Sequence, residues 1–401
     1  MRIARLQNPD DCSKARILIW DYTWDCGFGC LIHNAAFCLI IAAATNRTLV
    51  LESDGKNWPF RKELSKRLFQ SKIGWERIFL PITKCLYADA VSYIKRYFLV
   101  KPYSKVESSA RVARCTGFIG VDPKSHPISA PLAFPREIAD ILLTHHSNPP
   151  VFFIGQFIWY LMRHNAHFKE ILSQAEKEVQ FEKGPIVGLH IRRTDKIQEA
   201  KYHNVTEYMN WAEHWFQIQE KHQNITLTRR IYVSTDDVSV IEEIENEYPK
   251  FIIFKNKTRI ENAKLGNRHE LESLYGIIID IRILSRCDYV VCTFSSNACR
   301  VAYELMQILH GNATDMIHSL DDIYFYTHQQ PHEKIAIESY MPVSYNQIDL
   351  NIGDVIKIEQ NLWNGFCNGT NYRTGKIGLY PCNMTKEKWR IENFALFDFN
   401  S

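Results

Sequence analysis

Between residues 185 and 309 the sequence alternates strand-like and helix-like segments, and this alternation restricts the chain to an α/β fold. Apolar runs with strand character are separated by segments whose apolar residues recur every three or four positions. The strand-like runs are "PIVGLHI", "RRIYVSTDD", "KFIIFKN" and "DYVVCTF". Strands that are joined through helices lie parallel in one sheet. Residues 15–52 predict a shorter strand–turn–helix–strand series of the same kind.

The composition excludes several classes of protein. With 46% hydrophobic and 23% charged residues, the chain is globular rather than disordered. Its formal net charge of +3 is small for 401 residues, so nucleic acid is not a predicted partner and any anionic ligand must be bound locally. The longest apolar stretches, 35–44 and 151–162, are shorter than the roughly 18–20 residues of a membrane helix, and the N-terminal residues lack the apolar core of a signal peptide.

Cysteines and glycosylation sequons indicate an oxidising compartment. There are 11 cysteines, and the close pairs in "CGFGC" and "CTFSSNAC" can each close a small loop. Zinc binding is the alternative, but the spacings differ from those of two CxxC pairs. N-x-S/T sequons begin at Asn46, Asn204, Asn224, Asn256, Asn312, Asn368 and Asn383. Cysteines and sequons together favour a lumenal protein.

Changes in the pattern of strand-like and helix-like segments along the chain predict three domains. We assign residues 1–180 to an open α/β domain, 181–325 to a Rossmann-like nucleotide-binding domain and 340–401 to a domain of short strands. The last domain resembles an SH3 domain in its "GD" before an apolar run, its Trp-x-Gly and its "GLYP". It lacks the Tyr-rich opening that binds proline-rich peptides. A structural or substrate-shaping role is therefore expected.

Polar residues directly follow three of the predicted strands. "HIRRTDK" follows "PIVGL", "STDD" (234–237) ends the second run, and "CTFSSN" (292–297) ends the fourth. The carboxyl ends of parallel strands meet at one edge of a sheet, where α/β proteins bind their ligands. We therefore expect these three segments to converge on one crevice.

The segment around Arg192 suits a diphosphate ligand, because a guanidinium makes bidentate charge-assisted hydrogen bonds with phosphate oxygens. Strand alternation predicts that Arg192 faces the ligand together with His190 and Thr194. Arg193 and Asp195 would face the other side and pair with each other. The alternative is a surface ion-pair ladder, which the preceding apolar run and the two companion clusters disfavour.

Two further segments offer phosphate sites at the start of a helix. "CTFSSN" precedes a predicted helix, so backbone N–H groups and hydroxyls gather there. Simple helix capping by Ser295 or Ser296 is the alternative. "CGFGC" (26–30) has a similar place but lacks the spacing of a dinucleotide fingerprint or a P-loop.

The remaining candidate site residues are carboxylates. Glu199 is a candidate general base that Lys196 would orient, with a solvated carboxylate as the alternative. Asp280 lies inside the apolar "GIIIDIRIL", where a carboxylate needs a partner, and a purine edge or Arg282 is expected. The acidic residues of "TDD" (235–237) are adjacent rather than at i, i+2, which disfavours a metal site. Together these residues predict an enzyme that uses a nucleoside diphosphate donor without a metal.

The motifs occur together in one known family. "HIRRTDK…E", "VSTDD", "IIIDIRILS", "VCTFSSNACRVAYELMQ", "HSLDDIY" and the SH3-like tail resemble the eukaryotic core α1,6-fucosyltransferases (glycoprotein 6-α-L-fucosyltransferases) over essentially all 401 residues. The resemblance implies a GT-B-like fold with an SH3-like β-barrel. It implies inverting, metal-independent transfer of L-fucose from GDP-fucose to the innermost N-acetylglucosamine of N-glycans. A type II membrane protein of the Golgi lumen is expected in full-length form, and a homodimer is left open.

The resemblance also assigns roles to residues. Glu199 would take the proton of the acceptor hydroxyl with Lys196 beside it, and Arg192 would hold the β-phosphate. His190 and Asp280 would read guanine. The other donor contacts implied are Arg193, Asp237, Ser296, Asn297, Gly27 and Phe60. The acceptor contacts implied are Asp321 and Asp322. The disulfides implied are Cys12–Cys85, Cys26–Cys30 and Cys292–Cys299.

Some positions depart from the family pattern. The loop from Lys196 to Glu199 is one residue shorter than expected. Trp20 replaces a cysteine, which leaves Cys38 without its family partner, and Leu362 stands where a glycan-contacting histidine is common. Trp24 also stands where a lysine is usual. The shortened loop, Trp24 and Leu362 motivate an alternative function, a catalytically weak or inactive relative that binds GDP or glycan.

Overall fold

The chain forms two units, each described here by itself. The computed structural model describes residues 2–20, 26–52, 74–94, 110–115, 117, 131–267, 270–326 and 333–397. Unit 1 comprises residues 1–169, 326–331 and 389–401, and unit 2 comprises residues 170–325 and 332–388. The helix α7 (Ala166–Val179) carries the chain from the first to the second. The predicted boundary near residue 180 therefore differs from the observed one, because this helix spans it.

Unit 1 is built on a parallel sheet with the strand order β2–β1–β3. The helix α2 (Phe28–Ala44) connects β1 to β2 and is buried along nearly its whole length. Its sequence is apolar on all sides, as expected for a helix without a solvent face. The described elements of this unit are α1 (Arg2–Gln7), β1 (Ile17–Trp20), α2, β2 (Thr48–Leu51), α4 (Tyr87–Ile94), β3 (Val112–Cys115), β4 (Ala133–Pro135), α5 (Ala139–His145), α6 (Pro149–Leu161) and β15 (Arg390–Glu392).

Unit 2 contains a parallel five-stranded sheet with the order β7–β6–β5–β8–β9. Its first strand along the chain lies at the centre, with the next two strands on one side and the last two on the other. This is the order of a Rossmann-like sheet. The elements are β5 (Val187–Ile191), α8 (Val205–Gln223), β6 (Arg230–Thr235), α9 (Ser239–Glu247), β7 (Ile252–Phe254), α10 (Lys257–Ala263), α11 (Leu271–Leu284), β8 (Tyr289–Cys292), α12 (Asn297–His310) and β9 (Ile317–Ser319).

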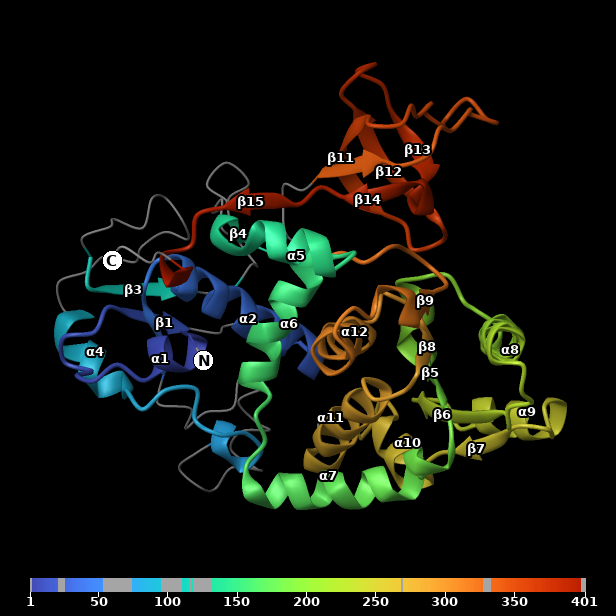
Figure 1. Ribbon diagram of the computed structural model, residues 1–401, viewed down its shortest axis with the longest axis horizontal. Helices are drawn as coiled ribbons and strands as arrows, with labels where there is room; N and C mark the ends of the chain where they lie inside the picture. Colours follow the sequence, from blue (N-terminus) through green and yellow to red (C-terminus); the bar gives the residue numbers. More distant parts are fainter. Residues whose placement is uncertain are drawn as a thin grey trace. The chain divides into compact units, whose positions relative to one another are not determined.

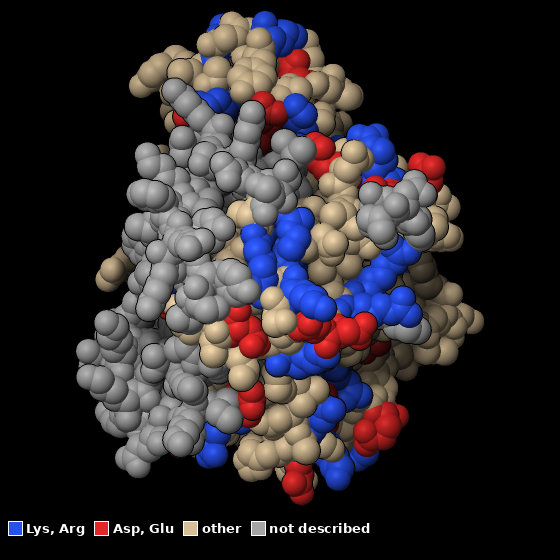
Figure 2. Space-filling model, turned by 90° about the vertical axis from the view of Figure 1, so that its left-hand side faces the viewer, with Lys and Arg blue, Asp and Glu red and all other residues tan. Residues whose placement is uncertain are grey.

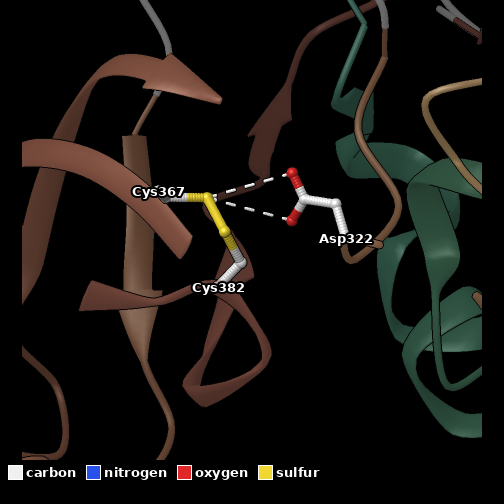
Figure 3. A group of neighbouring side chains, drawn as sticks. All are labelled: Asp322, Cys367 and Cys382. Atoms are coloured by element: carbon white, nitrogen blue, oxygen red, sulfur yellow. Dashed lines mark hydrogen bonds between the residues drawn. A yellow bond between two sulfur atoms is a disulfide. The ribbon is translucent and has the colours of Figure 1, made fainter. Parts of the chain in front are cut away.

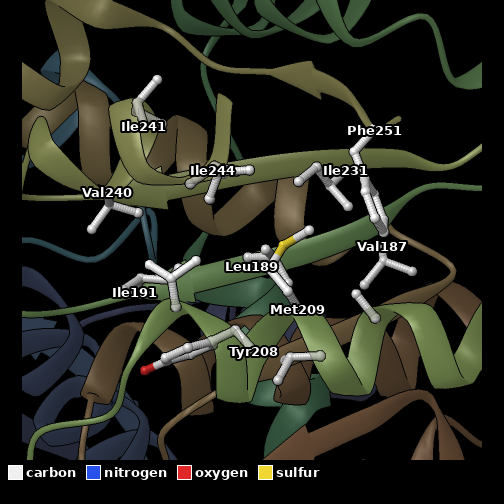
Figure 4. Packing of buried hydrophobic residues seen from close by; sticks show 14 of the residues in the cluster. Val187, Leu189, Ile191, Tyr208, Met209, Ile231, Val240, Ile241, Ile244 and Phe251 are labelled. Atoms are coloured by element: carbon white, nitrogen blue, oxygen red, sulfur yellow. The ribbon is translucent and has the colours of Figure 1, made fainter. Parts of the chain in front are cut away.

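Helices cover both faces of this sheet. In Figure 1, α8 and α9 lie on one face, and α10, α11 and α12 lie on the other. Figure 4 shows the first interface, where buried side chains of β5 and β6, such as Leu189 and Ile231, pack against Met209 of α8 and Ile244 of α9. Strands covered on both faces carry near-continuous apolar runs, which explains why nearly every residue of "PIVGLHI" is apolar. The predicted parallel α/β architecture is confirmed.

A second sheet in unit 2 is antiparallel, with the order β13–β12–β11–β10–β14. Its strands are β10 (Glu333–Ala336), β11 (Val355–Asn361), β12 (Phe366–Asn371), β13 (Ile377–Pro381) and β14 (Thr385–Glu387). We call residues 333–388 the β domain. The domain begins before the predicted residue 340 and ends before 401, because β15 pairs with β4 of unit 1 instead. Short strands were predicted, whereas the SH3 assignment stays a prediction.

Disulfides join segments that are distant in the sequence. The predicted pairs Cys12–Cys85, Cys26–Cys30 and Cys292–Cys299 are present. The sequence left the pairing of Cys38 open, and in the structure Cys38 on α2 pairs with Cys115. Cys115 lies in β3 directly beside Trp20 of β1, so a different strand supplies the cysteine. A further disulfide joins Cys367 to Cys382, and Cys287 is a buried free thiol.

The described surface carries charges of both signs. On the face shown in Figure 2, Lys and Arg side chains lie next to Asp and Glu side chains. This mixture agrees with the formal net charge of +3. In the described part of the chain, no helix is both long and apolar enough to cross a membrane.

The central strand of unit 2 tolerates no side chain at Gly188. A Cβ there would lie 2.8 Å from Leu284 Cδ2 and 3.0 Å from Cys287 Sγ. We expect Gly188→Ala to lower the free energy of unfolding by about 1–3 kcal/mol, as overpacking does in a closed core. Denaturant unfolding followed by circular dichroism measures this change.

Gly276→Ala on α11 is the matched control. There the nearest atom to an added Cβ is Arg259 Cγ at 3.6 Å. The helix interior favours alanine over glycine by roughly 1 kcal/mol, so this variant is expected to be at least as stable as the parent. Equal stability of the two variants would contradict the packing described for Gly188.

Candidate active site

Three polar segments meet at the carboxyl edge of the parallel sheet in unit 2. Hydrogen bonds join Arg192, after β5, to Asp236, after β6, and Lys196 to the carbonyl of Ser295, after β8. The strand order reverses between β5 and β8, which is where open α/β sheets bind their ligands. The predicted convergence of the three strand ends is therefore observed.

His190 is buried at the end of β5 between two hydroxyls. Its Nδ1 lies 3.3 Å from Ser234 Oγ and its Nε2 lies 2.9 Å from Ser296 Oγ. Burial, and then the neighbouring Arg192 guanidinium, lower the pKa of His190 to about 4. The ring is therefore neutral near pH 7, with one nitrogen that donates and one that accepts. Such a ring suits the recognition of a polar neutral group.

Asp280 is buried inside α11 and accepts hydrogen bonds from three side chains. Tyr232 Oη donates to it at 2.6 Å, Ser234 Oγ at 2.8 Å and Arg259 Nε at 2.9 Å. The sequence left the partner of Asp280 open between a purine edge and Arg282, and the structure adds Arg259. Arg259 on α10 reaches Asp280 because α10 packs along α11. The carboxylate is thus held within a polar network that reaches His190 through Ser234.

Arg192 is held by carboxylates from two segments. Its Nη2 lies 2.5 Å from Asp195 Oδ1, and its Nη1 binds Asp236 Oδ2 and donates to Thr194 Oγ1 at 2.9 Å. The predicted pair of Arg193 with Asp195 is therefore wrong. The reason is that β5 ends at Ile191 and a 3₁₀ turn over Thr194–Gln198 follows, so strand alternation does not continue.

Arg193 faces α9 instead. Its guanidinium lies 3.7 Å from Asp237 Oδ2 and 3.3 Å from Glu243 Oε2, and it covers the Tyr202 ring at 4.9 Å. Its backbone N–H donates to Asp236 Oδ1 at 2.9 Å. Asp236 therefore contacts both arginines, a role that the sequence did not reveal. The only signal for it was the adjacent acidic pair in "STDD".

Lys196 and Glu199 form a close ion pair on the 3₁₀ turn. Lys196 Nζ lies 2.6 Å from Glu199 Oε2 and 3.1 Å from the carbonyl oxygen of Ser295. The Lys196 side chain is only 13% exposed, whereas that of Glu199 is 56% exposed. An exposed carboxylate held by a fixed ammonium is a suitable proton acceptor for a bound hydroxyl.

The loop between β8 and α12 is organised by Asp321. The Asp321 carboxylate accepts the N–H of Phe294 at 2.8 Å, the N–H of Ser295 at 3.2 Å and the hydroxyl of Ser319 at 3.0 Å. Burial raises the pKa of Asp321. Ser296 then forms the N-cap of α12. Asp321 therefore shapes this loop, and its predicted contact with an acceptor glycan stays a prediction.

Asn297 and Gly27 both stand at the start of a helix. Asn297 is the first residue of α12, and its Oδ1 accepts from Arg300 Nη2 at 2.6 Å. Gly27 precedes α2 in unit 1, and a Cβ there would meet no atom within 4 Å. Phe60, the remaining predicted donor contact, and Trp24 lie outside the described residues.

Asp322 lies in a buried polar cluster that joins the α/β part of unit 2 to the β domain. Lys334 Nζ lies 3.3 Å from Asp322 Oδ1, and the Asn361 amide donates to Oδ2. Figure 3 shows the carboxylate beside the disulfide Cys367–Cys382. We call these five residues the Asp322 cluster. The Asp322 and Lys334 side chains are both 0% exposed, and the predicted contact of Asp322 with a glycan stays a prediction.

The Asp322 cluster does not offer a metal site. Asp322, Cys367 and Cys382 are the one group of three suitably spaced ligand residues found in the described part of the chain. The two sulfurs are joined in a disulfide, so neither is a thiolate ligand. In the acidic segment after β6, the carboxylates of Asp236 and Asp237 are engaged by Arg192 and Arg193.

A comparison with known families identifies the family of this chain. The family model for alpha-(1,6)-fucosyltransferase N- and catalytic domains matches residues 1–325. The chain belongs to the alpha-(1,6)-fucosyltransferase family. It is therefore a fucosyltransferase. The resemblance expected from the sequence is confirmed.

Curated relatives match this fucosyltransferase over nearly its whole length. The alpha-(1,6)-fucosyltransferase of Caenorhabditis elegans is 41% identical over 400 residues, which cover 99% of this chain and 68% of that protein. The enzyme of Drosophila melanogaster is 36% identical over 397 residues, which cover 99% of this chain and 60% of that protein. The chain thus spans roughly two thirds of the length of these relatives.

A solved structure with a distant likeness is the fucosyltransferase NodZ from Bradyrhizobium. It is 14% identical with a TM-score of 0.38, and the match covers 72% of this chain and 92% of NodZ.

The β domain of this fucosyltransferase contains a titratable carboxyl beside the Asp322 cluster. Burial raises the pKa of Glu387 from an ordinary value of 4.5 to about 8. The charge of Lys334 opposes this rise, and the charge of Asp322 adds to it. Between these two values the folded protein binds one more proton than the unfolded chain. The contribution of this group to stability therefore falls as the pH rises from about 4.5 to about 8.

We expect Glu387→Gln to remove this dependence. The free energy of unfolding of the variant, relative to the parent, should increase by at least about 1 kcal/mol between pH 5 and pH 8. Urea unfolding at both pH values measures it, with the exposed Glu338→Gln as the control. A constant difference across the range would show that Glu387 is ionised in the folded state.

Proposed function

We propose that this chain transfers L-fucose from GDP-fucose to the 6-hydroxyl of the innermost N-acetylglucosamine of N-glycans. The carrying observation is the Lys196–Glu199 pair, which stands between Arg192 and the start of α12 at the carboxyl edge of the sheet. A proton acceptor thus lies beside two elements suited to a diphosphate. The inverting and metal-independent course is part of the proposal.

The donor would bind along the segments after β5 and β8. Arg192, which is 21% exposed, would hold the β-phosphate through its planar fork. Ser296 and Asn297 would contribute the positive end of α12, a helix of 14 residues. Two such elements stabilise the charge that develops on the leaving diphosphate, so the proposal needs no metal ion.

Guanine would be read by the buried network behind these residues. His190 is neutral near pH 7 and presents one donor and one acceptor. Asp280 is fixed by Tyr232, Ser234 and Arg259, so its orientation is set before any ligand binds. Fixed polar groups of this kind discriminate between bases, because a mismatched ligand leaves buried groups unpaired.

Glu199 would act as the general base. Its Oε atom accepts the proton of the acceptor 6-hydroxyl while the oxygen attacks C1 of fucose, and the C1–phosphate oxygen bond breaks to release GDP. A single displacement of this kind inverts the anomeric centre. Lys196 would hold the carboxylate in place, since its ammonium is itself anchored on the Ser295 carbonyl.

The remaining features are proposals that rest on the family. Gly27 and Phe60 would contact the donor, and the fold would be GT-B-like. Residues 333–388 would be an SH3-like barrel that shapes acceptor binding. Disulfides such as Cys12–Cys85 support residence in an oxidising lumen such as the Golgi. A homodimer stays a prediction.

The test is transfer of fucose from GDP-fucose to a core N-glycan that carries a terminal N-acetylglucosamine arm. We expect the parent chain to form the α1,6 product, identified by NMR, without added metal and in the presence of EDTA. Glu199→Gln should lower kcat by about 10²–10⁴-fold, the usual contribution of a general base.

GDP binding separates loss of chemistry from loss of structure. Isothermal titration calorimetry should give the same Kd for Glu199→Gln and the parent, and the exposed Glu247→Gln on α9 should keep full activity. Equal transfer by Glu199→Gln would disprove the base assignment. GDP binding without transfer by the parent chain would support the alternative of an inactive relative, which the shortened loop between Lys196 and Glu199 motivates.

A further inference from the structure

The β domain contacts the segment that carries the proposed base. The loop between β11 and β12 places the Trp363 ring centroid 4.9 Å from Lys196 Nζ. The Trp363 carbonyl oxygen also accepts the backbone N–H of Lys201 at 3.2 Å. One residue of the β domain therefore holds both ends of the segment 196–201, in which Glu199 lies.

Trp363 has a backbone conformation that its surroundings impose. Its φ of 50° lies in the left-handed region, which is uncommon for a residue other than glycine and costs roughly 1–3 kcal/mol. Nearby, the Asn361 amide donates to Asp322, and the Cys382 N–H donates to the Gly365 carbonyl at 3.0 Å. The loop is thus anchored to the Asp322 cluster on both sides. Its fixed shape is what presents the indole to Lys196.

We propose that Trp363 is a positioning residue for fucosyl transfer. The Lys196 ammonium has three partners, namely Glu199, the Ser295 carbonyl and the Trp363 ring. A cation–π contact of a partly buried lysine contributes about 1–2 kcal/mol. Without the ring, Lys196 is less well fixed, and the exposed Glu199 loses its orientation. This inference rests on the proposed function, because it assigns Trp363 an effect on the Lys196–Glu199 pair.

The comparison of Trp363→Leu with Trp363→Phe tests the role of the ring. Both variants stay apolar, but only the Phe variant keeps an aromatic face for Lys196. We expect Trp363→Leu to lower kcat by about tenfold, which corresponds to a contact of about 1.4 kcal/mol. We expect Trp363→Phe to retain most of the parent kcat. The Kd of GDP and the KM of GDP-fucose should stay unchanged, because His190, Arg192 and Ser296 are untouched.

Hydrogen exchange provides a readout that does not depend on activity. We expect the amides of residues 196–201 to exchange faster in Trp363→Leu than in Trp363→Phe or the parent, while exchange in the strands of the β domain stays the same. If the Leu variant does not fold, Trp363→Gln repeats the comparison. Unchanged exchange and unchanged kcat in these variants would overturn the inference. If the parent chain transfers no fucose, the proposed function fails, and the exchange result still decides whether Trp363 orders the segment.

A separate observation concerns the sequon at Asn224. Asn224 caps the C-terminus of α8 with a φ of 53°, and Asn224, Ile225 and Thr226 are all exposed, Ile225 by 48%. Helix α8 begins just after the β5 segment and ends before β6 begins. Asn224 therefore lies at the amino edge of the sheet, opposite the site.

The other sequons lie partly buried, within a strand or at a helix start, although Asn204, Thr206 and Asn312 are themselves exposed. The hydroxyl residue is buried in the sequons of Asn46 and Asn383. Asn368 lies within β12. Asn256 caps α10 and accepts from the Arg259 N–H, Asn312 accepts from Thr314 and Asn204 begins α8.

We infer that Asn224 is an N-glycosylation site, given passage through the secretory lumen as in the proposed function. Its Nδ2 would lose one proton and bond to C1 of an oligosaccharide, and the lipid diphosphate that carried the sugar would leave. Expression in secretory cells should give a chain that glycosidase treatment shortens by one glycan. Asn224→Gln and Thr226→Ala should abolish that shift, whereas Thr226→Ser and Asn204→Gln should retain it.

The glycan readout is independent of transfer. Asn224→Gln is expected to keep the fucosyl transfer activity of the parent, because the residue is remote from the carboxyl edge. A chain secreted with no glycan on Asn224 would overturn the inference, whatever its activity.

Discussion

The carboxylate of Asp236 ties together the ends of two neighbouring strands, and the site depends on this tie. Its Oδ2 binds the Arg192 guanidinium, and its Oδ1 accepts the Arg193 N–H at 2.9 Å. Beyond the last residues of β5 and β6, no ladder of backbone bonds holds the chain. Asp321 does the same for the loop after β8. Buried carboxylates that accept backbone N–H groups thus fix the loops on which the reactive side chains stand.

Much of this arrangement could be predicted from the sequence. The parallel sheet follows from the spacing of apolar runs, and the convergence of polar residues follows from the rule that carboxyl ends of parallel strands share one edge. The Lys196–Glu199 contact was also predicted, because a nearby lysine can orient a candidate general base. Each of these inferences uses only neighbours in the sequence or the general geometry of an α/β fold.

The sequence was insufficient where a partner is distant in the sequence or where a strand ends early. Asp280 binds Arg259 on the preceding helix, a contact that no local spacing reveals. The predicted Arg193–Asp195 pair failed because alternation stops with β5 at Ile191. Asp322 is polar in type yet fully enclosed, because Lys334 and Asn361 approach it from the β domain. Burial of a charged residue depends on tertiary partners and therefore cannot be read from the motif alone.

Because β15 pairs with β4, the chain of unit 1 is completed later during synthesis than the chain of unit 2. Unit 2 lies between pieces of unit 1 in the sequence, and all of its residues leave the ribosome before residues 389–397 do. The Rossmann-like sheet can therefore assemble while unit 1 still lacks one of its strands. Until then, β4 presents an open strand edge, which is the kind of surface that chaperones cover.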